Sequence, residues 1–340
     1  MNAKPAVIVT SHKESPVDLE IVRGELGDRA SIRVVPLPHR KLTPVEEEAF
    51  ISQMVDAVVI FQRPGFITRK IIEACPHLKF VITHGAGVDK IDLKACEERG
   101  VWVGNVPGAN ANAVAEQVVA GIMVLLRRLT IANASMHRGG WKRGRYVGRE
   151  FSEGTLGIIG FGNVGRRLAQ IASGFGTRVI FYDPYLERGK IHETPGVTGY
   201  DNLDDLLGQS DYVSIHVPLT KETTGFIGLR ELRLMKKEAI LVNTSRGGII
   251  DEEALCVALR GGMIGGAVLD VFSEEPLPKG SPLRHFSNVV LTPHIGGSTR
   301  ECLQRIAQKA CEEILLVLSG QKPVNLVRTA GTGIDLTSRA

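Results

Sequence analysis

A glycine-rich turn and an acidic residue are the first groups whose types and spacing suggest chemistry. The run Gly160-Phe161-Gly162-Asn163-Val164-Gly165 fits Gly-x-Gly-x-x-Gly and lies between an apolar, strand-like run and a helix-like run. Its glycines would permit a tight turn, let the backbone approach a pyrophosphate and let the helix pack on the strand. Asp183 ends the next strand-like run, about 20 residues further on, where a carboxylate accepts hydrogen bonds from ribose hydroxyls and repels a 2′-phosphate. The pattern predicts a site for NAD rather than NADP, with these residues binding the cofactor: Gly160, Gly162, Asn163, Val164, Gly165 and Asp183.

Three polar side chains could carry out acid–base chemistry beside such a cofactor. Arg246, Glu275 and His294 each follow an apolar, strand-like run, and the carboxyl ends of parallel strands form the ligand-binding edge of a sheet. A guanidinium can fork onto a carboxylate and a carbonyl oxygen, and an imidazole can exchange a proton near neutral pH. A carboxylate beside the imidazole would hold its tautomer and keep it protonated for a reduction step. The three groups suit hydride transfer between a nicotinamide and a small 2-keto acid.

Each of these residues also has an ordinary structural interpretation. Arg246 could be a surface arginine in a turn, His294 a hydrogen-bonded structural histidine, and Glu275 a solvated loop residue. Asp183 could serve only to form the turn before Pro184. The order of strand, glycine turn, helix, strand and acid favours the functional interpretation of the cofactor motif.

Length and composition restrict the class of protein. A chain of 340 residues favours two domains, and 43% hydrophobic with 23% charged residues is ordinary for a globular fold. The formal charge of +4 is small, without the basic and aromatic tracts of a nucleic-acid-binding protein. The five cysteines form no Cys-x-x-Cys pair, which argues against a disulfide framework and a zinc site. The N-terminus has no signal-peptide pattern, and the apolar stretch Val118–Leu126 is too short to cross a bilayer. We expect a cytoplasmic protein that binds no metal, nucleic acid or membrane.

Short apolar runs alternate with helix-period segments along the chain, which indicates βαβ units and parallel sheets with helices on both faces. The candidate strands are Ala6–Thr10, Ser31–Pro36, Ala57–Phe61, Phe80–Thr83, Val101–Val103, Leu156–Gly160, Arg178–Tyr182, Tyr212–His216, Ala239–Asn243, Gly266–Asp270 and Val289–Leu291. Amphipathic segments such as Glu46–Val55 and Arg69–Ala74 lie between them.

The helices in the middle and at the end of the chain have candidate start signals. One long helix is expected from about Ala113 to Met136, with Asn110 or Asn112 as its cap. A last helix is expected from the capping box Ser298-Thr299-Arg300-Glu301, with the serine as cap, to about Leu318. The tail Arg328–Ala340, rich in Gly, Thr and Ser, is expected to be poorly ordered.

Several motifs, taken in order, resemble the D-isomer-specific 2-hydroxyacid dehydrogenase family from about Asp56 to Asn325. Besides the glycine motif with Asp183, they are His84-Gly85-Ala86-Gly87-Val88-Asp89, Asn105-Val106-Pro107-Gly108-Ala109-Asn110, Val114-Ala115-Glu116, His216-Val217-Pro218-Leu219-Thr220, Asn243-Thr244-Ser245-Arg246-Gly247, Asp270-Val271-Phe272 with Glu275-Pro276, and Thr292-Pro293-His294-Ile295-Gly296-Gly297. The resemblance implies two doubly wound α/β domains. A Rossmann NAD-binding domain, residues 106–292, would be inserted in a flavodoxin-like substrate domain, residues 1–105 and 293–340, with the substrate in the cleft between them.

The resemblance also implies roles for individual residues. Arg246 would bind the substrate carboxylate and carbonyl, His294 would be the acid/base, and Glu275 would support that histidine. Backbone amides of Gly85, Ala86 and Gly87 would help to hold the substrate carboxylate. Further cofactor contacts would come from Val217, Pro218, Thr244, Asp270, Gly296 and Gly297. Family members are usually homodimers, with the long helix near Ala113–Met136 in the contact.

The sequence is compatible with more than one substrate. The chain resembles the phosphoglycerate dehydrogenase branch, whose members often carry arginines at the positions that are Gln62 and Thr83 here. Arg63 is adjacent, but a shift by one residue changes the side-chain direction, and a phosphate needs a cationic partner. The candidates are therefore a dehydrogenase for a short 2-hydroxy acid, with hydroxypyruvate or glyoxylate as the keto acid, D-3-phosphoglycerate dehydrogenase itself, and a non-enzymatic NAD-sensing binding module. Formate dehydrogenase is disfavoured, because it typically has glutamine where Glu275 stands.

Overall fold

The computed structural model describes residues 4–186 and 196–327, which divide into two compact α/β units. Of the described residues, 4–110 and 297–327 form unit 1, and 111–186 and 196–296 form unit 2. Unit 2 is therefore inserted into the chain of unit 1. The expected tail Arg328–Ala340 lies outside the described residues.

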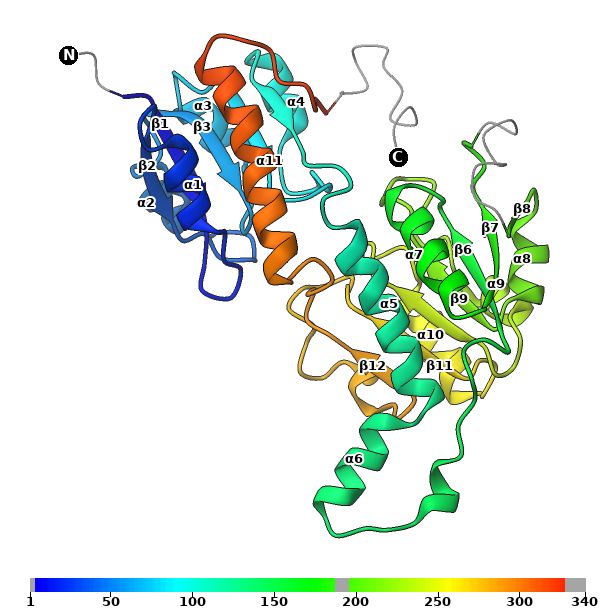
Figure 1. Ribbon diagram of the computed structural model, residues 1–340. Helices are drawn as coiled ribbons and strands as arrows, with labels where there is room; N and C mark the ends of the chain where they lie inside the picture. The colour runs from blue at the N-terminus through cyan, green and yellow to red at the C-terminus, as the bar shows by residue number, and fades with distance from the viewer. Residues whose placement is uncertain (1–3, 187–195, 328–340) are drawn as a thin grey trace. The chain divides into compact units, whose positions relative to one another are not determined.

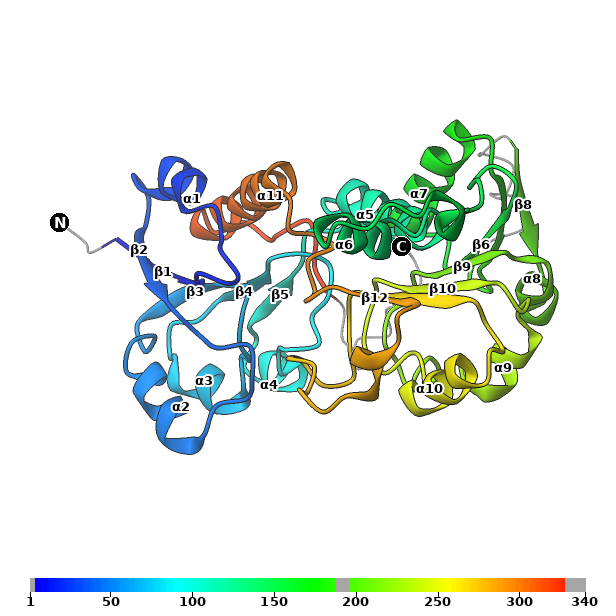
Figure 2. The same ribbon diagram turned by 90° about the horizontal axis from the view of Figure 1, so that it is seen from below.

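Unit 1 is a parallel sheet between two layers of helices (Figures 1 and 2). Its elements are β1 (Ala6–Thr10), α1 (Leu19–Leu26), β2 (Ser31–Val35), α2 (Pro44–Ile51), β3 (Ala57–Gln62), α3 (Arg69–Ala74), β4 (Phe80–Thr83), α4 (Leu93–Glu98), β5 (Trp102–Gly104) and α11 (Arg300–Leu318). The strand order is β2-β1-β3-β4-β5, the flavodoxin-like order in which ligands bind where the order reverses, between β1 and β3. Helices α1 and α11 cover one face, and α2, α3 and α4 cover the other (Figure 2).

Unit 2 is a larger parallel sheet with helices on both faces. Its elements are α5 (Ala111–Leu126), α6 (Leu129–His137), the short 3-10 helix η1 (Arg143–Tyr146), β6 (Thr155–Ile159), α7 (Asn163–Gly174), β7 (Arg178–Tyr182), β8 (Val197–Tyr200), α8 (Leu203–Gln209), β9 (Tyr212–Ile215), α9 (Leu229–Leu234), β10 (Ile240–Asn243), α10 (Glu252–Arg260), β11 (Gly266–Leu269), the 3-10 helix η3 (Pro282–His285) and β12 (Val289–Leu291). The order is β12-β11-β10-β9-β6-β7-β8. It reverses between β6 and β9, as in a Rossmann fold.

The strands of unit 2 are apolar runs because both faces of its sheet are buried. All five residues of β6 are buried, as are all four of β10 and of β11. One apolar cluster of unit 2 packs against α5 and α7, and a second packs against α8, α9 and α10, so both faces of the sheet are covered (Figure 2). The prediction of two doubly wound parallel-sheet folds is confirmed. Strand β8 was not predicted, because it is short, partly exposed and contains Thr198 and Gly199.

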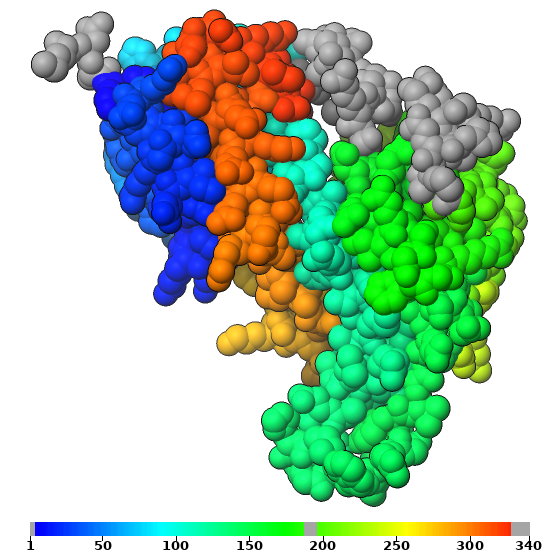
Figure 3. Space-filling model, in the orientation of Figure 1, coloured from blue at the N-terminus to red at the C-terminus, as the bar shows by residue number. Residues whose placement is uncertain are grey.

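The expected single helix over Ala113–Met136 is wrong, because the chain forms two helices bent by 62°. Arg128 adopts a left-handed φ of 53° between α5 and α6. The carbonyl oxygen of Leu126, at the end of α5, accepts a hydrogen bond from the amide of Arg149 at 3.1 Å, so the returning chain binds the end of this helix. Helix α6 therefore leaves the sheet, and Figure 3 shows its segment projecting from the rest of unit 2.

The predicted starts of two helices need partial correction. Helix α5 begins at Ala111, so of the two candidate caps Asn110 directly precedes it, and Asn112 lies inside its first turn, where its side chain bonds those of Glu116 and Arg167. The cap of α11 is Thr299, whose side chain accepts from the Cys302 amide, and not Ser298 in a capping box with Glu301. The Ser298 hydroxyl instead accepts from Nη2 of Arg63 at 3.4 Å.

Among the described residues, no helix on its own is both long and apolar enough to span a membrane, although the bent pair α5 and α6 passes that test of length and composition jointly.

Candidate active site

The glycine turn after β6 lies where the strand order of unit 2 reverses. Gly160 has a left-handed φ of 90°, and a Cβ there would lie 2.7 Å from the carbonyl oxygen of His216 at the end of β9. A Cβ on Gly165 would lie 2.4 Å from the carbonyl oxygen of Gly160, so helix α7 packs directly on the turn. Gly162 precedes α7 and supplies no capping side chain. The first amides of α7 therefore form a positive helix end beside the crevice.

Asp183 connects the glycine turn to the end of β7. Its Oδ2 accepts a hydrogen bond from the Phe161 amide at 2.8 Å, and its Oδ1 accepts from the Tyr185 amide at 3.0 Å. These bonds hold the carboxylate against the turn, while each oxygen keeps a second lone pair for a further donor. The geometry suits a carboxylate that binds hydroxyl groups at the turn.

The residues at this edge fit a dinucleotide. The turn lacks the Cβ atoms that would fill the crevice, and α7 presents its first amides without a side-chain cap. The hydroxyl of Thr244, after β10, is buried and has no hydrogen-bond partner among the described residues. A buried hydroxyl without a partner is costly unless a ligand supplies one. The turn, Asp183 and Thr244 could hold the pyrophosphate, a ribose and a polar group of the cofactor.

The strand register brings the three candidate catalytic loops to one edge of unit 2. Asn243, Leu269 and Leu291 are register partners at the ends of β10, β11 and β12, so the loops that follow these strands emerge side by side. A Cβ on Gly247 would lie 1.9 Å from the Phe272 carbonyl oxygen, which shows how closely the first two loops pack. Arg246 is in the first loop, Glu275 in the second and His294 in the third.

Asp270 fixes the third loop. This residue is fully buried, and its Oδ1 accepts from the Thr292 hydroxyl at 2.6 Å and from the Ile295 amide at 2.8 Å. Its Oδ2 accepts from the Gly296 amide at 2.7 Å, and its carbonyl oxygen accepts from the His294 amide at 2.8 Å. These four hydrogen bonds hold the backbone of His294 and the residues on either side of it.

His294 and Glu275 form the pair that the sequence predicts. Nδ1 of His294 lies 2.9 Å from Oε2 and 3.1 Å from Oε1 of Glu275. Because an ionised carboxylate only accepts, this contact places a proton on Nδ1 and leaves Nε2 for another partner. His294 has a left-handed φ of 54°, a strained conformation for a residue with a Cβ, and such strain is concentrated at functional sites.

Arg246 is held by its own loop. Its Nη1 donates to the Ser245 carbonyl oxygen at 2.7 Å, and its carbonyl oxygen accepts from Nδ2 of Asn243 at 2.8 Å. Oδ1 of Asn243 also accepts from the amide and the hydroxyl of Ser245. Asn243, at the end of a buried strand, thus shapes the loop that carries the guanidinium.

The other predicted binding residues fall in both units. In unit 2, Val217 packs on Gly160, and the Pro218 carbonyl oxygen accepts from the Thr223 hydroxyl. A Cβ on Gly296 would lie 3.0 Å from Asp270. Asn163 and Val164 begin α7, while Gly297 belongs to unit 1.

The predicted carboxylate-binding turn is also in unit 1, after β4. Gly85 has a φ of 133°, and its carbonyl oxygen accepts from the Val106 amide. Ala86 follows it, and its carbonyl oxygen accepts from Nδ2 of Asn105 at 2.8 Å. Gly87 completes the turn. These bonds hold the turn at the ligand-binding edge of the unit 1 sheet.

A comparison with known proteins agrees with this geometry. Residues 119–296 match the family model described as D-isomer specific 2-hydroxyacid dehydrogenase, NAD binding domain. The chain belongs to this family. It is 41% identical over 286 residues to D-3-phosphoglycerate dehydrogenase of Methanocaldococcus jannaschii, covering 84% of this chain and 54% of that protein. It is 42% identical over 267 residues to glyoxylate reductase of Thermofilum pendens, covering 77% and 78% of the two chains.

The fold agrees with solved structures as well. The TT0316 protein from Thermus thermophilus superposes with a TM-score of 0.83 at 34% identity, covering 95% of this chain and all of that one. The chain spans about half the length of the D-3-phosphoglycerate dehydrogenases that it matches. Because the matching family model is that of the NAD-binding domain, the family assignment includes such a domain.

Two residues that the sequence did not predict hold loops of the candidate site. Nε2 of Gln117, on α5, donates to the Thr292 hydroxyl at 3.0 Å, and that hydroxyl donates to Asp270. Oε1 of Glu252, on α10, accepts from the Ser273 amide at 2.6 Å and so holds the Glu275 loop. Gln117 and Glu252 carry no local signal, because their partners are distant in sequence.

Two positions where relatives in the phosphoglycerate branch were expected to carry arginines hold a neutral pair instead. The hydroxyl of Thr83 donates to Oε1 of Gln62 at 2.9 Å. Nε2 of Gln62 donates to the carbonyl oxygens of Arg63 and Gly65. Both side chains are buried, so these bonds already occupy the groups that could face a phosphate.

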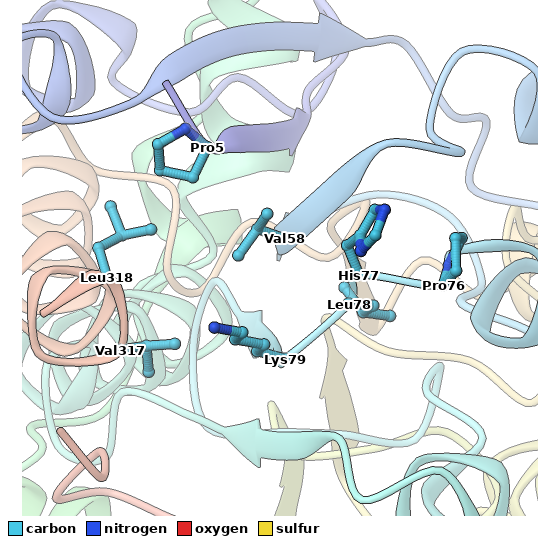
Figure 4. A pocket seen from close by; sticks show the side chains of 8 residues that line it. All are labelled: Pro5, Val58, Pro76, His77, Leu78, Lys79, Val317 and Leu318. Carbon is cyan, nitrogen blue, oxygen red and sulfur yellow. The ribbon is translucent and has the colours of Figure 1, made fainter. Parts of the chain in front are cut away.

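A cavity of about 410 Å³ lies at the opposite edge of the unit 1 sheet (Figure 4). Pro5 and Lys79 precede β1 and β4, and Val317 and Leu318 end α11. This is the amino-terminal edge of the strands, whereas ligands of parallel sheets bind at the carboxyl edge. Among residues 4–186 and 196–327, no three His, Cys, Asp or Glu side chains form a group that could hold a metal ion.

Proposed function

We propose that the protein is an NAD-dependent D-2-hydroxyacid dehydrogenase that interconverts a small 2-hydroxy acid and its 2-keto acid. The observation that carries the proposal is the His294–Glu275 contact of 2.9 Å at the same sheet edge as Arg246 and the glycine turn. The family assignment and the relative that is named glyoxylate reductase support it. In this proposal unit 2 corresponds to the NAD-binding domain expected over residues 106–292, and unit 1 corresponds to the substrate domain.

In this proposal Arg246 and His294 of unit 2 have separate roles in the reaction. NADH, when bound along the glycine turn, supplies the hydride. The Arg246 guanidinium binds the carboxylate of the keto acid and polarises its carbonyl oxygen through a second N–H group. Nε2 of His294 donates a proton to that oxygen as negative charge develops, and takes the proton back in the oxidative direction.

Glu275 and Asp270 act through His294. The Glu275 carboxylate accepts from Nδ1, which directs Nε2 toward the substrate and stabilises the positive charge of the protonated ring. Asp270 holds the loop on either side of the histidine through the Thr292 hydroxyl and the Ile295 and Gly296 amides. We also propose that backbone amides of Gly85, Ala86 and Gly87 in unit 1 help to bind the carboxylate.

The test is NADH oxidation with glyoxylate, hydroxypyruvate and phosphohydroxypyruvate, using wild type and two variants. His294→Ala should lower kcat by at least 100-fold, because it removes the acid–base group, while NADH binding measured by fluorescence stays unchanged. His285→Ala is the matched control, because His285 is an exposed histidine of the same unit. Near-wild-type turnover by His294→Ala would remove the proposed proton donor. NADH binding without turnover of any keto acid would favour a non-enzymatic NAD-binding module.

We further propose a homodimer formed through α6 and the segment after it. Leu129, Met136, Trp141 and Val147 are between 50% and 74% exposed in this segment, an amount of apolar surface typical of interaction sites. Sedimentation equilibrium should give twice the chain mass, and Trp141→Asp should shift the equilibrium toward the monomer. The five free cysteines, all buried, are compatible with a reducing, cytoplasmic location.

A further inference from the structure

The reversal point of the unit 1 sheet contains a partly buried cation. Arg63 directly follows β3, and the crevice of this strand order lies between β1 and β3. The hydroxyl of Thr10, the last residue of β1, accepts from the Arg63 amide and donates to the Pro64 carbonyl oxygen, both at 3.0 Å. The backbone of Arg63 is therefore fixed at the position where a doubly wound sheet binds ligands.

The guanidinium of Arg63 has unmet hydrogen-bonding capacity. Its Nη1 is buried and has no partner among the described residues, and its Nη2 makes only a long contact of 3.4 Å with Ser298. Among the described residues no carboxylate raises the pKa of Arg63, and burial lowers that pKa to about 10. A guanidinium nitrogen that is buried without a hydrogen-bond partner is costly, and an anionic ligand at this position would supply the missing acceptor.

A second unpaired nitrogen lies beside this cation. Gln62 and Thr83 are register partners at the ends of β3 and β4, so Arg63 and His84 are the next residues on neighbouring strands. The His84 amide donates to the Gln62 carbonyl oxygen at 2.6 Å, and its ring stacks on Phe61. Nε2 of His84 is buried without a partner in the described residues. Burial, and secondarily the charge of Arg63, lower the pKa of His84 to about 3, so the ring is neutral at pH 7.

We propose that Arg63 and His84 form an oxyanion-binding point at the strand edge of unit 1, which takes carboxylate or phosphate oxygens. Nη1 of Arg63 donates a charge-assisted hydrogen bond, and the neutral His84 ring donates a second one through Nε2–H. The neighbouring Gln62–Thr83 pair cannot take this role, because its polar atoms bond each other and the backbone. The anion could be a second charged group of the substrate or a free inorganic oxyanion.

The direct test is binding of inorganic phosphate and of oxalate by calorimetry, at constant ionic strength and without NADH. Arg63→Met should weaken binding by about 10- to 100-fold, the typical loss of a buried charge-assisted bond. His84→Phe, which retains an aromatic ring to stack on Phe61, should weaken it less. Arg29→Met is the control, because Arg29 is an exposed arginine of unit 1 that precedes β2 at the opposite sheet edge.

Thermal unfolding separates binding from folding. Without phosphate, Arg63→Met should melt at or above the wild-type temperature, since it removes a buried guanidinium nitrogen that has no hydrogen-bond partner among the described residues. With phosphate, wild type and Arg29→Met should gain stability and Arg63→Met should not. Equal phosphate binding by wild type and Arg63→Met, or no binding of either anion by wild type, would overturn the proposal.

A kinetic comparison identifies the source of the anion, and this part alone rests on the proposed function. If the anion belongs to the substrate, Arg63→Met should lower kcat/KM for phosphohydroxypyruvate relative to hydroxypyruvate by at least tenfold. If the ratio stays the same while phosphate binding is lost, a free oxyanion occupies the point. Failure of every keto acid as a substrate would remove the proposed function and leave the binding result intact.

Discussion

Asp270→Asn tests whether the buried carboxylate positions the acid–base loop. The substitution keeps the shape of the side chain but replaces one of two acceptor oxygens by a donor. The Asp270 carboxylate accepts three hydrogen bonds, one from the Thr292 hydroxyl and two from the backbone amides of Ile295 and Gly296. If the new NH₂ group faces Gly296, one buried amide is left without an acceptor, and the two other bonds lose their charge assistance.

The expected magnitude follows from these bonds. An unsatisfied buried amide costs about 2 kcal/mol, and two bonds that change from charged to neutral lose about 1 kcal/mol each. The total of about 4 kcal/mol is reduced by the lower desolvation cost of a neutral amide, so we expect a destabilisation of about 3 kcal/mol. For a unit of this size, that lowers the melting temperature by roughly 10 °C.

The same change should lower turnover. His294 lies between the residues that Asp270 holds, and its own amide donates to the Asp270 carbonyl oxygen. A displacement of about 1 Å at a catalytic group costs on the order of 100-fold in rate. We therefore expect kcat to fall by about that factor in Asp270→Asn.

The assays are differential scanning calorimetry, steady-state kinetics and NADH fluorescence titration. Asp205→Asn, at an exposed aspartate of the same unit, should melt within about 1 °C of wild type. A melting temperature and kcat close to wild type in Asp270→Asn would refute the hydrogen-bond argument. A large loss of NADH affinity at unchanged stability would instead show that Asp270 acts mainly by contacting the cofactor.

Two further predictions concern the cofactor and pH. Asp183→Ser should reduce the preference for NADH over NADPH, because it removes the carboxylate that repels a 2′-phosphate. The ratio of kcat/KM for the two cofactors measures this preference. An unchanged ratio would contradict the proposed contact of Asp183 with the ribose. Burial lowers the pKa of His216 to about 3, from 6.5. Between these pH values the unfolded chain therefore binds one more proton than the folded chain, so the free energy of unfolding falls as pH decreases. From pH 7 to pH 5 this histidine should lower the free energy of unfolding by about 2 kcal/mol. In urea unfolding, His216→Asn should lose less stability over this range than wild type, and His285→Asn should lose as much as wild type.

The strands, and the sheet edge at which the proposed catalytic residues lie, could be predicted because their signals are local. A strand that is buried on both faces, such as β10, reads as a continuous apolar run. The residues that follow such runs, Arg246 and His294 among them, must then lie at the carboxyl edge. The observed pairing of His294 with Glu275 was predicted from the resemblance and from the chemistry of imidazole.

The helix break and the supporting hydrogen bonds could not be predicted, since they depend on distant residues. Composition favours helix through Arg127 and Arg128, but the returning chain at Arg149 takes the Leu126 carbonyl oxygen. The Gln117–Thr292 bond likewise joins residues 175 positions apart. Periodicity describes how one segment faces a core and carries no information about such partners.

Under the proposed function, the positions of the polar groups place the reaction chemistry in one unit and the choice of ligand in the other. The glycine turn, Arg246, Glu275 and His294 all belong to unit 2, where Asp270 holds the acid–base loop. Arg63 belongs to unit 1 and shares no described hydrogen bond with that network. Substitutions at the unit 1 edge can therefore change which anion is bound while the hydrogen bonds that position His294 stay the same. If Arg63→Met altered the pH dependence of kcat with a monoanionic keto acid, this separation would be wrong, because the proton-transfer groups would then respond to a charge outside their own unit.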